Sequence, residues 1–305
     1  MSGDSLKDYH AAIGHREMAT IKNLPRLPKS PVTLCGPGTY QPTRDKKVKA
    51  LQCYEELIKF LPTDRSVASS SLWHGDLHVA NIFVNPSKPT EIVGLIDWQS
   101  TELAPLYFHA RQPHIIDYDG PAVNGLERPS PPKDIEQLDP DAKRAAQALY
   151  LQQSLCVLYN TLVHQQSPRL YGALEFQQTP SYLLLLLARN IVVDGEATYL
   201  SQVAELEKVW DMLPDVHGAV YPFSFSAEDK VEMKADVEGV ERGMDLMRRI
   251  KESLGELFPE QGIVRHEQYG KTLDALSQMR EQVIEDFANN EQEREVWKAE
   301  WPFGN

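Results

Sequence analysis

A cluster of polar side chains in the first third of the chain has the composition of a phosphoryl-transfer site. His74, Asp76 and Asn81 lie within eight residues of one another, and Asp97 follows sixteen residues after Asn81. Phosphoryl transfer to a hydroxyl group needs a carboxylate that orients the hydroxyl and accepts its proton, together with ligands that hold Mg²⁺ on the phosphates. Asp76 fits the first task. Asn81 and Asp97 fit the second, because Mg²⁺ prefers hard oxygen ligands.

The elements on either side of these residues must position them. Residues 81–84 and 92–96 are short apolar segments that predict β-strands, and the turn between them contains proline and serine. In an antiparallel hairpin the two ends opposite the turn lie next to each other. We therefore expect Asn81 and Asp97 to meet at the open end of a hairpin that directly follows the Asp76 loop.

Two sequence segments carry a family resemblance. HGDLHVANIFV and GLIDWQ resemble the catalytic loop and the metal-binding segment of the aminoglycoside phosphotransferase family, a branch of the protein-kinase-like fold. The flanking segments GHREMATIKNLP and WQSTELAPLYFHARQPHIIDY resemble a fungal group called altered inheritance of mitochondria protein nine. The resemblance covers most of the chain, although only the two motif segments are specific, and Val79-Ala80 stands where many relatives have Pro-Gly.

The resemblance implies roles for individual residues. Asp76 would be the catalytic base, Asn81 and Asp97 would hold Mg²⁺ on bound ATP, and His74 would be a structural residue that braces the loop. The implied fold class is α+β and predominantly α: a protein-kinase-like large lobe with a short β-hairpin. The implied activity is ATP- and Mg²⁺-dependent phosphoryl transfer to a hydroxyl of a small-molecule acceptor.

Each site residue also has a plainer interpretation. Asp76 could be a surface turn residue and Asn81 a cap at the start of a strand, but their joint pattern with Asp97 favours the phosphotransferase reading. His74 and His78 have the spacing of a zinc pair, although Gly75 between them disfavours the regular helix that presents such a pair.

Further along the chain, Asp117 and Asp119 are compatible with substrate contacts. Asp119 stands directly before a glycine, however, and aspartates beside glycine occur more often in turns.

A kinase-type fold also needs a small β-rich lobe with a phosphate-covering loop and a strand lysine. The residues before His74 instead predict a helix at 4–23, a proline-rich connector at 24–43 and a helix at 44–60. Ala19 to Lys22 imitate the strand-lysine motif but continue a helical pattern. We therefore expect the small N-terminal lobe to be missing. This chain alone would then be a weak or inactive enzyme, or alternatively a non-catalytic, pseudokinase-like binding or scaffold protein.

The remainder of the sequence predicts mainly helices. They are expected at residues 141–164, 181–191, 198–213, 226–254 and 270–290. A loop at residues 111–140 contains six prolines and is too long for a simple connector, which indicates either a functional or a disordered segment. We predict a large lobe at residues 1–222 and a helical C-terminal extension at 223–305.

Composition limits the classes of partner. Among 305 residues, 44 acidic and 31 basic side chains give a formal charge of −13, most of it beyond residue 200, which argues against nucleic acid as a partner. Acidic side chains in the variable helices and the 111–140 loop suit a cationic acceptor. No apolar run reaches the roughly 20 residues of a membrane span. Three cysteines without a CxxC pair suggest buried thiols. The resemblance implies a mitochondrial location; no presequence is visible, and otherwise we expect a cytoplasmic one.

Overall fold

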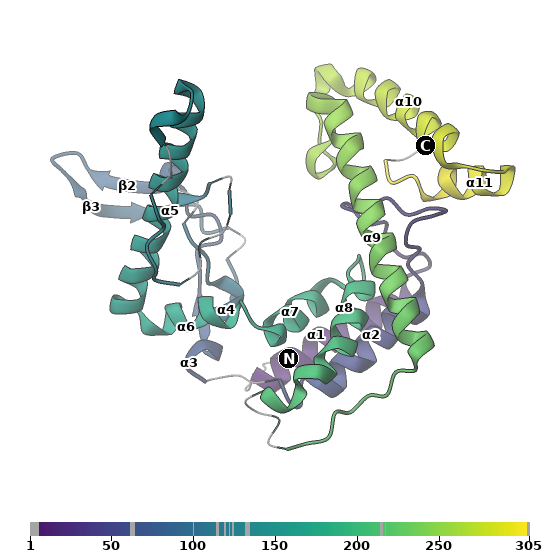
Figure 1. The fold of residues 1–305 in the computed structure, drawn as a ribbon, viewed down its shortest axis with the longest axis horizontal. Helices are drawn as coiled ribbons and strands as arrows, with labels where there is room; N and C mark the ends of the chain where they lie inside the picture. Colours follow the sequence, from purple (N-terminus) through teal and green to yellow (C-terminus); the bar gives the residue numbers. More distant parts are fainter. Residues whose placement is uncertain are drawn as a thin grey trace. The chain divides into compact units, whose positions relative to one another are not determined.

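The computed structural model of the chain, shown in Figure 1, is built largely of helices. It describes residues 6–61, 65–99, 101–113, 116–118, 120, 121, 123, 125–131, 135–213, 216 and 218–303. Contacts divide the chain into two compact units, the first formed by residues 1–62 and 183–305 and the second by residues 63–182. The second unit is thus inserted into the sequence of the first.

Helices form the first unit. They are α1 (Leu6–Asn23), α2 (Arg44–Leu57), α8 (Glu196–Leu206), α9 (Ala227–Leu254), α10 (Tyr269–Phe287) and α11 (Glu291–Glu300), with 3₁₀ turns η4 (Ala188–Asn190), η5 (Glu207–Met212), η6 (Gly255–Leu257), η7 (Glu260–Gly262) and η8 (His266–Gln268). Helix α1 packs on α2, α2 packs on α8, and α8 packs on α9. Helix α7 (Pro180–Leu187) lies at the boundary between the units.

A buried ion pair fixes the centre of the first unit. Lys47 of α2 is fully buried, and its Nζ atom lies 2.8 Å from Glu196 Oε2 at the start of α8. The same ammonium donates to the carbonyl oxygen of Ile191, and the hydroxyl of Tyr40 donates to Glu196 Oε1. Because each buried charge has several hydrogen-bond partners, the network specifies how α2, α8 and the turn between α7 and α8 assemble.

The proline-rich connector packs against the C-terminal helices. The amide of Leu34 donates to the carbonyl of Gly243 in α9 over 3.1 Å, and a Cβ at Gly239 would lie 2.9 Å from the amide nitrogen of Tyr40. Leu34 also shares a core with α9, α10 and Trp297. The backbones approach closely because both positions on α9 lack a side chain. The predicted domain boundary at 222/223 remains a prediction.

The second unit carries all of the strands in the described residues. It contains α3 (Arg65–Ala68), β1 (Ser70–Leu72), η1 (Val79–Asn81), β2 (Ile82–Asn85), β3 (Lys88–Leu95), β4 (Leu103–Pro105), α4 (Leu106–His109), η3 (Ile135–Gln137), α5 (Pro140–Gln166) and α6 (Pro168–Phe176). Strands β2 and β3 form the predicted antiparallel hairpin, with Ile82 opposite Leu95 and Phe83 opposite Gly94. A second antiparallel pair joins β1 to β4. The predicted α+β, predominantly α fold class is confirmed.

Most predicted helices are present with shifted ends, and residues 4 and 5 of the first prediction lie outside the described residues. The capping box expected at the start of α9 is formed by Ser226 and Asp229. Ala19 to Lys22 continue α1 as expected. Several short elements were not predicted: the β1–β4 pair, whose strands are three residues long, the helices α3, α4 and α6, and the terminal α11. The three cysteines are buried, and burial raises the pKa of the Cys35 and Cys53 thiols to about 11.

A separate prediction concerned membranes. In the part of the chain that the structure describes, no helix is both long and apolar enough to cross a bilayer.

Candidate functional site

Backbone hydrogen bonds shape the loop that carries Asp76. The amide of His78 donates to the carbonyl oxygen of Asp76 over 3.1 Å, and Nδ2 of Asn81 donates to the same oxygen over 2.9 Å. The main chain of Asp76 is therefore fixed from two directions. Its side chain remains 60% exposed and lies 3.5 Å from Nε2 of His78. An exposed carboxylate on a fixed backbone is accessible to an incoming hydroxyl group.

Asn81 connects this loop to the hairpin. It is buried, and its carbonyl oxygen accepts a 3.1 Å hydrogen bond from the amide of Ile96, the residue before Asp97. The structure therefore brings Asn81 and Asp97 to the same end of the hairpin, as the sequence predicts. The side-chain nitrogen Nδ2 of Asn81 donates to the Asp76 carbonyl. The side-chain oxygen Oδ1 of Asn81 is therefore the atom left to bind a cation.

His74 bonds to the carbonyl group of the same residue, Ile96. Its Nε2 atom lies 2.7 Å from the carbonyl oxygen of Ile96, so Nε2 is the protonated nitrogen that donates. The ring packs edge-on against Trp98, with ring centroids 4.8 Å apart, and the Trp98 indole donates to the carbonyl of Leu95. His74 thus contacts the residues on both sides of Asp97.

Asp97 itself has an uncommon backbone conformation. Among the described residues it is the one non-glycine residue with a positive φ, at 63°. This left-handed region is sparsely populated for residues with a Cβ, although Asp and Asn tolerate it better than most. Strained conformations of this kind are retained where the surrounding contacts impose them. Here Asn81 and His74 both bond to the backbone of Ile96, the residue before Asp97.

The donor set suits Mg²⁺ better than a metal held by protein ligands alone. Asn81 Oδ1 and the Asp97 carboxylate would supply two oxygen ligands, and Mg²⁺ typically takes one or two protein carboxylates with water and phosphate oxygens completing its shell. Within the described ranges, no three or more His, Cys, Asp or Glu side chains gather as a metal site. The His74–His78 zinc reading finds no support, because His74 Nε2 and both nitrogens of His78 have other partners.

A small cavity of about 270 Å³ lies beside the Asp76 loop. His74 and Leu77, which flank the turn with Asp76, form part of its wall, and Arg111 and Gln112 form another part. Most of its other lining side chains are apolar or aromatic: Leu72, Trp73, Pro113 and Tyr159. The cavity thus lies between the segment that flanks Asp76 and the start of the 111–140 loop.

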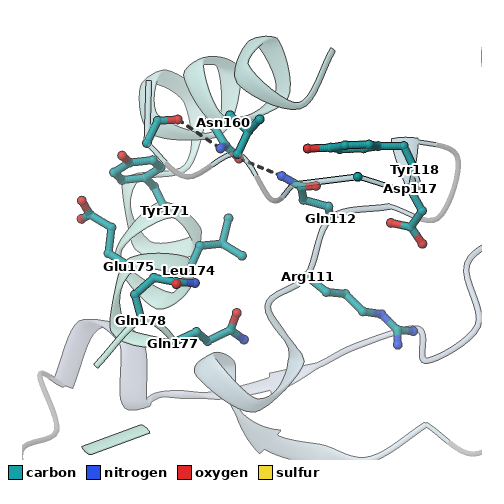
Figure 2. Close-up of a pocket in the computed structure, with 13 residues that line it drawn as sticks. Arg111, Gln112, Asp117, Tyr118, Asn160, Tyr171, Leu174, Glu175, Gln177 and Gln178 are labelled. Atoms are coloured by element: carbon teal, nitrogen blue, oxygen red, sulfur yellow. Dashed lines mark hydrogen bonds between the residues drawn. The ribbon is translucent and has the colours of Figure 1, made fainter. Parts of the chain in front are cut away.

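A larger cavity of about 440 Å³, shown in Figure 2, also has Arg111 and Gln112 in its wall. Helix α5 anchors the loop around it. Asn160 Nδ2 donates to the carbonyl of Gly125, Gln112 Nε2 donates to Asn160 Oδ1, and the Tyr159 hydroxyl donates to the carbonyl of Arg111. Directly after α6, Gln177 Nε2 donates to the carbonyls of Tyr107 and Ala110, which precede the loop. In the described part of the loop, residues 111, 112 and 125 are thus held by α5.

The sequence did not single out the residues of this larger cavity, apart from Asp117, which lines it. Asp119 lies outside the described residues. Glu175 and Tyr171 come from α6, which was not predicted, and burial together with the Glu175 carboxylate raises the pKa of Tyr171. The length of the 111–140 loop was the available signal, because long ordered loops commonly carry function.

Comparison with known proteins places part of the chain near a phosphotransferase family. Residues 18–108, which include His74, Asp76, Asn81 and Asp97, match the model of the phosphotransferase enzyme family. The chain is 22% identical over 304 residues to two curated Aspergillus fumigatus proteins, one from each of two strains, both named subtelomeric hrmA-associated cluster protein. These alignments cover 99% of this chain and 58% of each relative. The relatives are thus fungal cluster proteins and do not single out the mitochondrial-inheritance group. No solved structure gives a significant match.

Proposed function

We propose that this chain carries the catalytic-loop unit of a phosphotransferase that uses ATP and Mg²⁺ to phosphorylate a hydroxyl group of a small molecule. The observation that carries the proposal is the convergence at Ile96. Its amide donates to the backbone carbonyl of Asn81 and its carbonyl accepts from His74, so the residue before Asp97 is bonded to Asn81, which in turn bonds to Asp76. The match of residues 18–108 to the phosphotransferase model supports the same chemistry.

In the proposed mechanism Asp76 orients the acceptor hydroxyl and takes its proton. A bond forms between the acceptor oxygen and the γ-phosphorus of ATP, and the bond from that phosphorus to the β-phosphate bridging oxygen breaks, so that ADP leaves. Asn81 and Asp97 would hold Mg²⁺, which supplies positive charge to the phosphate oxygens when bound. His74 acts as a positioning residue, because it contacts the peptide before Asp97.

We further propose that this chain alone transfers phosphate slowly or not at all. Residues 6–61 of the described chain form α1, the connector and α2, whereas the resemblance requires a β-rich lobe that clamps ATP. The apolar side chains of Ile92, Val93 and Ile96 are exposed by 61%, 61% and 47%, which is consistent with a hairpin that binds a further part of the enzyme. The chain spans 58% of the length of its curated relatives.

Calorimetric titration of Mg-ATP into the purified chain tests the proposal. We expect binding at or below millimolar nucleotide, loss of binding in Asp97→Asn, and unchanged binding in Asp141→Asn, which removes an exposed carboxylate of the same unit. No heat at millimolar Mg-ATP would contradict the proposal. Absence of any transfer by the full gene product, under conditions that supply Mg-ATP and candidate acceptors, would instead assign the alternative of a non-catalytic binding or scaffold protein.

The location in the cell is a separate proposal. The resemblance implies mitochondria, and microscopy of a fluorescent fusion of the full gene product checks this.

A further inference from the structure

Three charged side chains line the larger cavity. Arg111 and Asp117 come from the loop after α4, and Glu175, which lies opposite Arg111, comes from α6. Figure 2 shows Glu175 and Tyr171 on one side of the cavity and Arg111 on the other. Both elements belong to the second unit, so the cavity is built within one compact part of the chain.

Arg111 and Glu175 form no ion pair among the residues that the structure describes. Within the described residues, neither the Arg111 guanidinium nor the Glu175 carboxylate lies within 4.0 Å of an opposite charge, whereas exposed pairs such as Lys230–Glu207 form elsewhere in the chain. Charged groups at the wall of a concave site gain most from a ligand of opposite charge, because a charge-assisted hydrogen bond is stronger than a neutral one. The cavity therefore offers one site for an anion and a separate site for a cation.

Several of the other polar lining atoms are already used. Asn160 accepts from Gln112 and donates to the Gly125 carbonyl, and Gln177 Nε2 donates to two backbone carbonyls. These contacts order the walls and leave Gln177 Oε1 as an acceptor for a ligand. The ring of Tyr171 lies beside Glu175, and aromatic faces attract ammonium groups.

Arg111 and Gln112 also line the smaller cavity, which His74 and Leu77 border on the other side. A ligand whose anionic group binds Arg111 therefore has its neighbouring atoms at the boundary with the cavity beside Asp76. This placement is useful for an acceptor whose hydroxyl lies near its anionic group.

Taking the proposed function as a premise, we propose that the 440 Å³ cavity binds a small hydroxylated zwitterion as acceptor. Its carboxylate binds Arg111, its ammonium group lies against Glu175 and Tyr171, and its hydroxyl points toward the Asp76 loop. This refines the cationic acceptor expected from the acidic composition, because the cavity adds a site for a negative group.

A matched series of probes tests the two charges separately. The zwitterion 4-amino-3-hydroxybutanoate, its analogue without the amine (3-hydroxybutanoate) and its analogue without the carboxylate (1-amino-2-propanol) share one hydroxylated skeleton. L-carnitine adds three methyl groups to the ammonium and tests a bulkier zwitterion. Each is titrated calorimetrically into the full chain without nucleotide. We expect one of the two zwitterions to bind at least about 10-fold more tightly than either single-charge analogue.

Variants assign the two ends of the ligand. Arg111→Gln should remove the preference for the zwitterion over 1-amino-2-propanol, and Glu175→Gln should remove its preference over 3-hydroxybutanoate. Arg128→Gln, which removes an exposed arginine outside the cavity lining, should change neither preference. Circular dichroism of each variant establishes that it is folded.

The failures of the two proposals are distinguishable. Binding by none of the four probes, or equal binding of the zwitterions and a single-charge analogue, overturns the zwitterion proposal even if Mg-ATP binds. Zwitterion binding without any Mg-ATP binding removes the proposed phosphotransfer but retains the ligand class of the cavity.

Discussion

The Nε2 atom of His74 lies 2.7 Å from the carbonyl oxygen of Ile96, so the imidazole holds the peptide that immediately precedes Asp97. Asn81 bonds to the amide of the same residue from the other side. The loop of Asp76 and the segment of Asp97, which are twenty-one residues apart, are thereby joined through Ile96. This relationship explains how Asp97 is kept in a left-handed conformation, with φ at 63°.

The carboxylate of Asp97 should affect Mg-ATP binding, and the backbone conformation of this residue should affect the stability of the chain. Asp97→Ala and Asp97→Gly both remove the proposed Mg²⁺ ligand, so both should lose Mg-ATP binding. Alanine is disfavoured in the left-handed region by roughly 1–2 kcal/mol, whereas glycine adopts it readily. Urea unfolding should therefore find the alanine variant less stable than the glycine variant by about 1 kcal/mol. Equal stabilities of the two variants would contradict the role assigned to this conformation.

Acid should weaken the first unit through His10. Burial, with a smaller effect from the charge of Arg189, lowers the pKa of His10 from 6.5 to about 4. As pH falls below 6.5 the unfolded chain binds a proton that the folded chain excludes, so stability is lost between pH 6.5 and about 4. The full loss is about 3 kcal/mol.

Unfolding free energies measured from pH 7.5 to pH 4 check this effect. The variant His10→Gln cannot titrate at this position, so its stability should fall less steeply than that of the unmodified chain. Parallel pH dependences in the two proteins would show that His10 does not carry the effect.

The buried pair of Lys47 and Glu196 should behave as a unit. Lys47→Met leaves the Glu196 carboxylate buried without its cation and should cost about 3–5 kcal/mol in the free energy of unfolding. The double variant Lys47→Met with Glu196→Gln removes both charges and should recover a large part of that loss. Denaturant unfolding of the single and double variants gives the coupling energy. Additive effects would rule out the coupling expected from their 2.8 Å contact.

Close packing of the connector against the terminal helices predicts a steric effect at Gly36. A Cβ at this position would lie 2.3 Å from the ring of Trp297, which is buried. Gly36→Ala should therefore destabilise the chain by about 1–3 kcal/mol. The matched control is Gly270→Ala in the first turn of α10, where a Cβ meets no atom within 4 Å, and it should be neutral or slightly stabilising. Thermal unfolding of both variants makes the comparison.

The sequence predicts the local parts of the candidate site well. Asn81, Ile96 and Asp97 come together because a hairpin joins them across a short turn, and apolar alternation with turn residues is readable from the chain alone. Long amphipathic helices such as α9 are predicted for the same reason, since their period and their capping box are local signals.

Features that depend on distant contacts were not predictable. Strands β1 and β4 have three residues each, and their pairing joins residues 70–72 to residues 103–105, so neither has a pattern of its own. Arg111 and Glu175 face one cavity although 64 residues separate them. Their placement depends on the hydrogen bonds that join the loop to α5, and neither composition nor periodicity encodes which partners are chosen.

The insertion of the second unit into the first has a consequence for protein synthesis. Lys47 leaves the ribosome 149 residues before its partner Glu196, and Lys29 leaves it 272 residues before the Trp301 carbonyl to which it donates. The inserted unit, whose sequence is continuous, is able to fold while the chain is still growing. The first unit, by contrast, is completed only after α8 emerges to pack on α2 and after the terminal helices emerge to pack on the connector. We therefore expect newly made chains to depend on chaperones most strongly during this interval.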